Sequence, residues 1–198
     1  AALILDGASP TLEAMKFQGV NTSSVLVHNL ATPTFVGGEF VNGDDEGEIA
    51  GNGVQIYGAG TTFTPTTMAS PVFTGGSKGC GQQDGGRHVL WAQESFISIQ
   101  NAVVASGDFG FRSESSSGTI SSATIAVTCN AIDVNGAKVV GSQKRTLTVT
   151  TSDLNPEEGA GFTVADGAKV VLSNSKIEGS SGGSGVFVKS SEAHIHDN

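Results

Sequence analysis

Positive charge and large aromatic side chains are scarce in this chain. Only ten of its 198 residues are Lys or Arg, against 19 Asp or Glu, so the formal net charge is −9, and there is one Trp and one Tyr. Nucleic-acid backbones and anionic membrane surfaces are bound by clustered basic residues. Because the basic residues here are scattered, we expect neither of these partners.

Long hydrophobic runs and processing signals are also missing. No apolar run approaches the roughly 18 residues that a membrane span requires, and no stretch has the composition of a signal peptide. The chain starts at Ala1 in a strand-like run, without an initiator Met. We therefore expect no membrane span, and a mature product or an excised segment.

Cysteine is limited to Cys80 and Cys129, which stand 49 positions apart. This spacing matches neither a CxxC redox pair nor a zinc site. Two alternatives stay open: a disulfide, which requires an oxidising compartment, or two small apolar side chains inside the fold.

Glycine, in contrast, is abundant. The chain has 28 Gly against five Pro, and only 15% of its residues are charged. Together with many Ser, Thr and Val residues, this composition favours short strands and tight turns over helices. The length suits one domain with a substantial core. We therefore expect a single all-β domain over residues 1–198.

A pattern of two apolar residues separated by four others recurs along the chain, at steps of 22 or 23 residues where it is clearest. The pairs are Leu12 and Phe17, Phe35 and Phe40, Val127 and Ile132, Val149 and Leu154, and Leu172 and Ile177. Units of this size cannot bury their own apolar face, so they stack as the coils of a solenoid.

The first residue of each pair extends to a set of eight equivalent positions, which predicts about eight rungs. The set is Leu12, Phe35, Phe73, Ile99, Val127, Val149, Leu172 and Ile195. Irregular steps within it place loop insertions around 42–67 and 75–118, the second of them in 75–86 and 109–118. Insertions in solenoids often form the working surface.

Two further features recur in each unit. Apolar runs at 138–140, 162–164 and 186–188 predict a second strand in the rung. Polar residues follow the first strand and predict a hydrogen-bonded ladder along the solenoid axis, although Asn and Ser are also simply common in turns. The ladder residues are Asn101, Asn130, Ser152, Ser175 and Asn198.

Several units open on a Pro-containing start, at 9–11, 32–34 and 70–72, and close on Gly. With the apolar cores and the polar bend, they resemble the right-handed parallel β-helix repeat of pectate-lyase-like proteins, adhesins and polymorphic surface proteins. The resemblance implies an all-β, single-stranded right-handed parallel β-helix. It implies no one activity, because such proteins include polysaccharide lyases, hydrolases, epimerases, phage tailspikes and structural stalks.

An enzyme on this scaffold requires acid and base groups, or a base with a charge-stabilising partner. The candidate residues are Asp84, Arg87, His88, Asp108 and Arg112. The alternative is that they are solvated loop residues with weak surface pairs. Because the paired Asp, Gly-His-Gly and Arg-x-Lys motifs of the family's pectin hydrolases are missing, we assign no catalytic residue.

Metal sites have weak candidates. The acidic stretch Asp44 to Glu48, preceded by Asn42, offers oxygen ligands that Ca²⁺ prefers, but its spacing is that of neither a helix-flanked calcium loop nor a glycine-rich nonapeptide repeat. His194 and His196 share a strand face and lack an evident third ligand. The sequence favours a solvated loop and a solvated pair, so we assign neither metal nor cofactor.

Ligand-binding surfaces have three further candidates. Trp91 and Tyr57 are able to stack on a sugar if they lie outside the solenoid. The Thr-rich run at 61–67 resembles a loop with possible O-glycan sites. The Thr-rich run at 146–151 predicts one strand, and the eight marker positions reveal no Thr row across many rungs of the kind that an ice-binding face needs.

These observations favour a non-catalytic extracellular or cell-surface module, structural or adhesive, such as a stalk, cell-wall or appendage component. We expect a polysaccharide or another surface protein as partner. The chain stops at Asn198 inside a predicted strand and turn with no cap, so we expect a segment of a longer solenoid or end-to-end stacking. The alternative is a polysaccharide lyase or glycoside hydrolase on the same scaffold.

Overall fold

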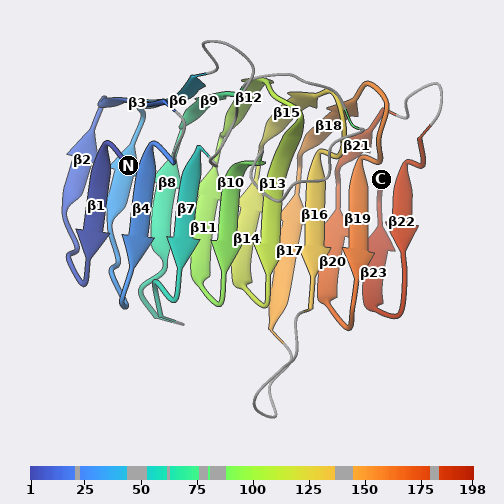
Figure 1. Ribbon diagram of the computed structural model, residues 1–198. Helices are drawn as coiled ribbons and strands as arrows, with labels where there is room; N and C mark the ends of the chain where they lie inside the picture. Colours follow the sequence, from blue (N-terminus) through green and yellow to red (C-terminus); the bar gives the residue numbers. More distant parts are fainter. Residues whose placement is uncertain are drawn as a thin grey trace.

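The fold is a stack of parallel strands. The computed structural model describes residues 1–20, 23–43, 53–61, 63–75, 80, 88–136, 145–178 and 183–198. In these residues there are 23 strands and no helix, and the strands form three parallel sheets (Figure 1). The predicted all-β parallel β-helix is therefore confirmed.

The chain passes through the three sheets in turn, once per rung. The first sheet, sheet A, contains β1 (Leu3–Asp6), β4 (Val25–His28), β7 (Val54–Tyr57), β10 (His88–Gln93), β13 (Phe109–Glu114), β16 (Ile132–Asn135), β19 (Phe162–Ala165) and β22 (Val186–Val188). Sheet B contains β2 (Thr11–Glu13), β5 (Thr34–Val36), β8 (Thr66–Ala69), β11 (Phe96–Gln100), β14 (Ser117–Ser121), β17 (Thr146–Thr150), β20 (Lys169–Ser173) and β23 (Glu192–His196). Sheet C contains β3 (Lys16–Val20), β6 (Glu39–Gly43), β9 (Val72–Thr74), β12 (Val103–Ser106), β15 (Thr124–Val127), β18 (Asp153–Pro156) and β21 (Lys176–Ile177).

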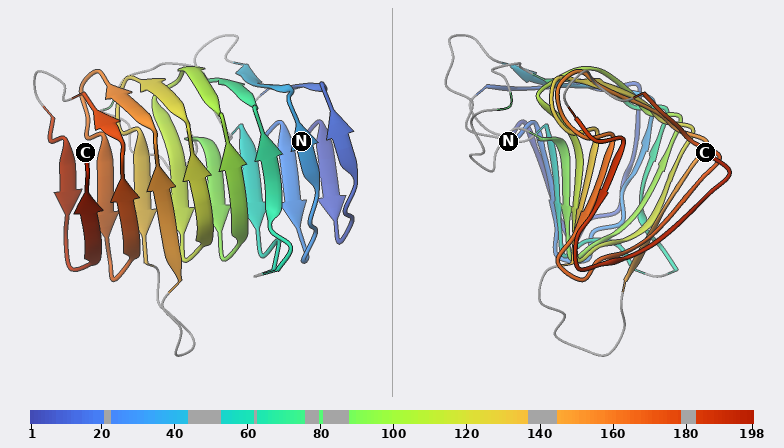
Figure 2. Two further views of the ribbon diagram at one scale, coloured as in Figure 1. Left: turned by 180° about the vertical axis from the view of Figure 1, so that it is seen from behind. Right: turned by 90° about the vertical axis from the view of Figure 1, so that its right-hand side faces the viewer.

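Eight strands in sheets A and B confirm the predicted eight rungs. Viewed along its axis, the stack has a roughly triangular section (Figure 2). Side chains alternate along each strand, so every second residue points into the interior. The inner residues of β4, Val25 and Val27, are completely buried, and so are those of β17, Leu147 and Val149.

Six of the eight predicted marker residues share one inward row on sheet B. This row is Leu12, Phe35, Met68, Ile99, Ile120, Val149, Leu172 and Ile195. Two predictions were wrong: Phe73 and Val127 belong to sheet C, where they pair with Phe40 and Pro156. Sheet C also has an apolar inward row, so an apolar period alone does not tell the two sheets apart.

The interior contains a stack of four aromatic rings. The centroids of Phe17 and Phe40 are 5.4 Å apart, those of Phe40 and Phe73 are 5.2 Å apart, and those of Phe73 and Phe111 are 5.5 Å apart. Three of these rings lie on consecutive strands of sheet C, and Phe111 reaches them from sheet A. The stack ties the N-terminal half of the solenoid together.

The corner between sheets B and C requires one residue with positive φ in every rung. These residues are Ala14, Gly37, Ser70, Asn101, Ser122, Thr151, Asn174 and Asp197. The predicted polar ladder begins one residue later: Ser152 Oγ accepts from Ala123 N at 3.2 Å, Ser175 Oγ from Ser152 N at 3.2 Å, and Asn198 Oδ1 from Ser175 N at 2.8 Å. The ladder is confirmed for its last three members. Asn101 instead takes the positive φ, and Asn130 lies at another corner, where it accepts from Ala160 N at 2.8 Å.

The predicted insertions are correct in part. Within 42–67, residues 54–57 form the regular strand β7. Within 75–118, residues 109–114 belong to β13 and 117–118 to β14, with a two-residue turn between them, so the surplus predicted at 109–118 was wrong. Residues 44–52, 76–79 and 81–87 lie outside the described residues. Because Val127 was taken as a marker residue in place of Ile120, the sequence analysis missed a further long connection, between β16 and β17. Most of this connection, residues 137–144, also lies outside the described residues.

The other sequence-based predictions can be placed on this frame. Phe162–Val164 and Val186–Val188 are paired strands of sheet A, as expected, while 138–140 lie outside the described residues. Cys80 and Cys129 form a disulfide, with their Cα atoms 5.3 Å apart, which decides between the two alternatives.

Candidate functional site

The outer face of sheet A carries a polar cluster around Asp133 of β16. Asp133 Oδ1 accepts from Asn130 Nδ2 at 3.0 Å and from the Thr163 hydroxyl of the neighbouring strand. Its other oxygen, Oδ2, lies 3.4 Å from Nε2 of the buried His88. The His88 ring lies against Phe109, with centroids 5.0 Å apart. The cluster therefore ties β10, β16 and β19 together from outside.

Asp133 is held as a carboxylate. Burial raises its pKa, but the hydrogen bonds from His88, Thr163 and Asn130 and the charge of His88 outweigh burial, so its pKa lies below the usual 3.8. Hydrogen bonds to the charged form favour that form. Because both oxygens are engaged by protein groups, the arrangement suits a cross-strand clip better than a proton donor.

Replacing Asp133 with Asn is expected to lower the free energy of unfolding at neutral pH by about 1 to 3 kcal/mol, because a charged hydrogen-bond acceptor of three side chains is lost. The folded-state pKa is depressed, so this contribution is complete above the unfolded-state pKa and is lost as the pH falls through the folded-state value. Urea unfolding of both proteins at a series of pH values should give a difference that narrows below pH 3.8.

Asp166, in an exposed turn, provides the control. Asp166→Asn should change stability by less than about 0.5 kcal/mol, since Asn tolerates its positive φ. A difference between wild type and Asp133→Asn that stays constant down to the lowest pH would contradict the ionised clip.

Of the five catalytic candidates, His88, Asp108 and Arg112 lie within the described residues. Asp84 and Arg87 lie outside the described residues. Asp108 is buried, and its backbone oxygen accepts from Cys129 N at 2.7 Å. Arg112 Nε donates to Glu114 at 2.7 Å, and its guanidinium lies 5.8 Å from the Trp91 ring centroid. His88 has a carboxylate neighbour, Asp133, that the sequence analysis did not single out.

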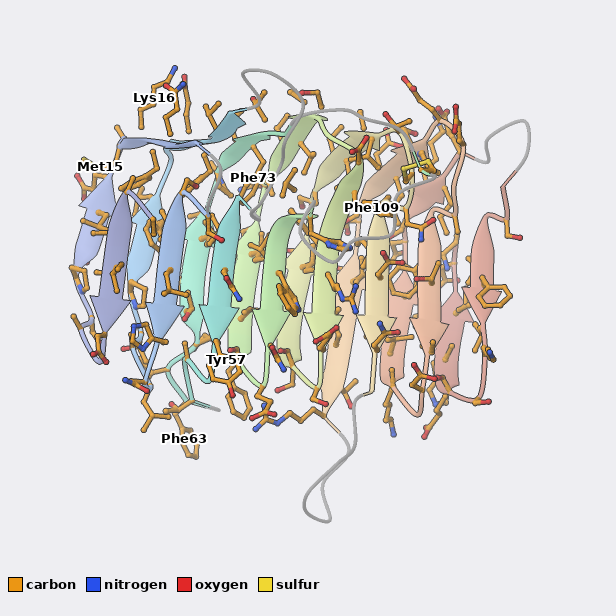
Figure 3. All side chains as sticks on the ribbon, viewed as in Figure 1. Met15, Lys16, Tyr57, Phe63, Phe73 and Phe109 are labelled. Carbon is orange, nitrogen blue, oxygen red and sulfur yellow. A yellow bond between two sulfur atoms is a disulfide. The ribbon has the colours of Figure 1, made fainter. Side chains whose placement is uncertain are left out.

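The sugar-stacking candidates face outward. Trp91 is half-buried beside Arg112. Tyr57, on the adjacent strand β7, is 47% exposed (Figure 3). Stacking on a sugar stays a prediction for both. The Thr-rich run at 61–67 includes β8 from Thr66 and, apart from residue 62, lies within the described residues.

The metal candidates gain no support. His194 lies 3.2 Å from Glu192, and His196 lies 2.8 Å from Asp197, so each ring faces one carboxylate. Asp44, Glu46 and Glu48 lie outside the described residues. Among the residues described, no three His, Cys, Asp or Glu side chains are grouped so as to hold a metal ion.

The outer face of sheet B carries a row of hydroxyl groups, which we call the hydroxyl row. Its members come from six consecutive strands and pair directly in register: Thr11, Thr34, Thr67, Ser98, Thr119 and Thr148. The row continues as Val171 and His194. This overturns the expectation that no Thr row crosses many rungs.

The row was missed because of the two misassigned markers. Each member directly precedes the inward residue of its strand, as Thr67 precedes Met68 and Thr119 precedes Ile120. With Phe73 and Val127 as markers, the same position reads Val72 and Ala126, which breaks the row. A signal for it does exist in the sequence: Thr or Ser followed by an apolar residue, once per rung.

The central strands of this face are built from uncharged residues. Strands β5, β8, β11, β14 and β17 contain no Asp, Glu, Lys, Arg or His, although the chain carries a net charge of −9. We call their combined outer surface the hydroxyl face. Charged side chains lie on the strands at either end, Glu13 on β2 and Lys169 on β20, where Lys169 pairs with Glu192 at 3.0 Å.

No family model matches the chain, and no match is found among curated proteins or solved structures. The structure alone therefore defines the class, a parallel β-helix with a hydroxyl face. The part of the chain that it describes has no helix long and apolar enough to cross a membrane.

Proposed function

We propose that this chain is a non-catalytic module of an extracellular or cell-surface structure, which adheres through an outer face of the solenoid. The observation that carries the proposal is the hydroxyl face, where five neighbouring strands present aligned, uncharged side chains. A rigid in-register face suits contact with an extended surface. The disulfide between Cys80 and Cys129 supports an oxidising location.

A polysaccharide-active enzyme is the second candidate. The contact between His88 and Asp133, with Trp91 and Arg112 on neighbouring outward positions of sheet A, favours it. Against it, both oxygens of Asp133 are already engaged, and His88 is only 4% exposed. A group that acts as acid or base must reach the proton it transfers.

A turnover assay separates the two. The purified protein is incubated with a panel of acidic and neutral polysaccharides, and reducing ends and unsaturated products are followed over time. We expect no product. Product formation that disappears in His88→Ala and persists in the matched surface variant His194→Ala would overturn the non-catalytic proposal and establish the second candidate.

A further inference from the structure

The hydroxyl row repeats at the strand spacing of the sheet. Neighbouring strands of a β-sheet lie about 4.8 Å apart, so six in-register strands place their hydroxyls at one regular interval. Every pairing along the row from Thr11 to Thr148 is free of a register shift, whereas β12 and β9 of sheet C shift between Val104 and Ser106. Five of the six side chains also carry a methyl group. The row is therefore a periodic array of hydroxyls and methyls.

The hydroxyls of the row are largely unused by the protein. Within the described part of the chain, the one side-chain hydrogen bond made by a member of the row is a long one, from Thr67 Oγ1 to the Pro65 carbonyl at 3.4 Å. All six side chains are half-buried or exposed. These groups are therefore available to water or to an external partner.

On one side of the hydroxyl row the side chains are neutral, and on the other a single guanidinium lies over an aromatic ring. A second outward row holds Val36, Ala69, Gln100, Ser121 and Thr150. Arg145, which precedes β17, donates to the Ser115 carbonyl at 2.9 Å and holds its guanidinium 5.0 Å from the Phe96 ring centroid. Removing water from charged side chains costs far more than removing it from hydroxyls and methyls. Apart from Arg145 at the Phe96 edge, the two rows present uncharged groups, so they suit a neutral, ordered partner.

Sugars are a poorer match for this face than ordered water is. Proteins commonly hold sugars on exposed aromatic rings, and the outward aromatic of the hydroxyl face, Phe96, lies under Arg145. Each hydroxyl both donates and accepts hydrogen bonds, so hydroxyls at a regular interval are able to bond to successive waters held at that interval. The interval of the strands is close to the oxygen repeat of an ice surface.

We propose that the hydroxyl face binds the surface of ice. This inference rests on the proposed function, because it names the surface to which the module adheres. Thr34, Thr67, Ser98, Thr119 and Thr148 bond to the outermost waters of the lattice, and the methyls of the Thr residues fill the spaces between those waters. Val36, Ala69 and the rest of the second row extend the neutral contact.

The test measures thermal hysteresis and inhibition of ice recrystallisation for three full-length proteins: wild type, Thr119→Lys and Thr124→Lys. Thr119 and Thr124 are both exposed strand residues, on the outer faces of sheet B and sheet C respectively. We expect activity in wild type, loss of it in Thr119→Lys, and wild-type activity in Thr124→Lys. Circular dichroism checks that all three are folded.

Other outcomes overturn the inference. A folded wild type without hysteresis or recrystallisation inhibition would refute it, and so would equal loss in the two Lys variants. Co-sedimentation with insoluble cellulose or chitin that Thr119→Lys abolishes, without any effect on ice, would assign the face to a polysaccharide and leave the adhesive function standing. Polysaccharide turnover would refute the proposed function itself, whatever the result with ice.

Discussion

Replacing Gly118 with alanine is expected to lower the free energy of unfolding by about 3 to 5 kcal/mol, which is exceptional for the addition of one methyl group. Gly118 has φ +135, where side chains are rarely accepted, and it pairs with Ile97 of the preceding rung. A Cβ here would overlap the Ile97 carbonyl oxygen and lie 2.8 Å from its carbonyl carbon. Both atoms belong to the backbone, so β14 would have to move away from β11. Urea unfolding followed by circular dichroism measures the loss.

Gly37 provides a matched control for this substitution. It also has a positive φ, +66, but a Cβ there would meet nothing within 4 Å. The equivalent residue of the preceding rung is already an alanine, Ala14, at φ 49. Gly37→Ala should therefore cost only about 1 to 2 kcal/mol. Equal losses at the two positions would show that φ alone, rather than contact between rungs, sets the cost at Gly118.

Phe73→Ala is expected to cost about 3 to 5 kcal/mol, because a large buried ring is lost and the rungs around it cannot collapse fully into the cavity. Phe73 has no exposed surface, and its ring contacts both Phe40 and Phe111. The substitution therefore removes the middle of the aromatic stack. The denaturation midpoint is the measurement.

The matched control is Phe63→Ala. Phe63 is 96% exposed and projects from the corner between sheets A and B (Figure 3). Its removal should leave the free energy of unfolding within about 0.5 kcal/mol of wild type. If Phe73→Ala were as mild as this control, the aromatic stack would not support the fold.

The sequence specifies the class of fold well because each rung repeats one physical requirement. An inward apolar residue must recur once per coil, and where connections are short this period is a direct count of residues. Val149, Leu172 and Ile195 follow one another at intervals of 23 residues, and all three were placed correctly. Rung assignment failed at Phe73 and Val127. Long connections change the number of residues per coil there, so the spacing no longer shows whether an apolar residue belongs to sheet B or to sheet C.

The candidate sites were harder to predict for a related reason. The contact of His88 with Asp133 joins residues 45 positions apart, and no local pattern signals it. The hydroxyl row does leave a local signal in each strand, but a row exists only after the strands are aligned. One misplaced marker at Phe73 replaces Thr67 with Val72 and breaks it. An error of a few residues in the predicted register is therefore enough to conceal a surface row, although the predicted class of fold stays correct.

The strict pairing of rung on rung also determines how such a face is able to change through evolution. Each of the first six coils adds one member to the hydroxyl row at the same spacing, so duplication or loss of one of these coils lengthens or shortens the face without altering the interval between hydroxyls. The stability of stacked repeats comes from each unit and its contacts with immediate neighbours. Adding or removing one coil would therefore change the stability of distant rungs little. Long connections, like that between β16 and β17, leave the paired strands in register. The area available for adhesion is therefore a property that changes in units of one coil.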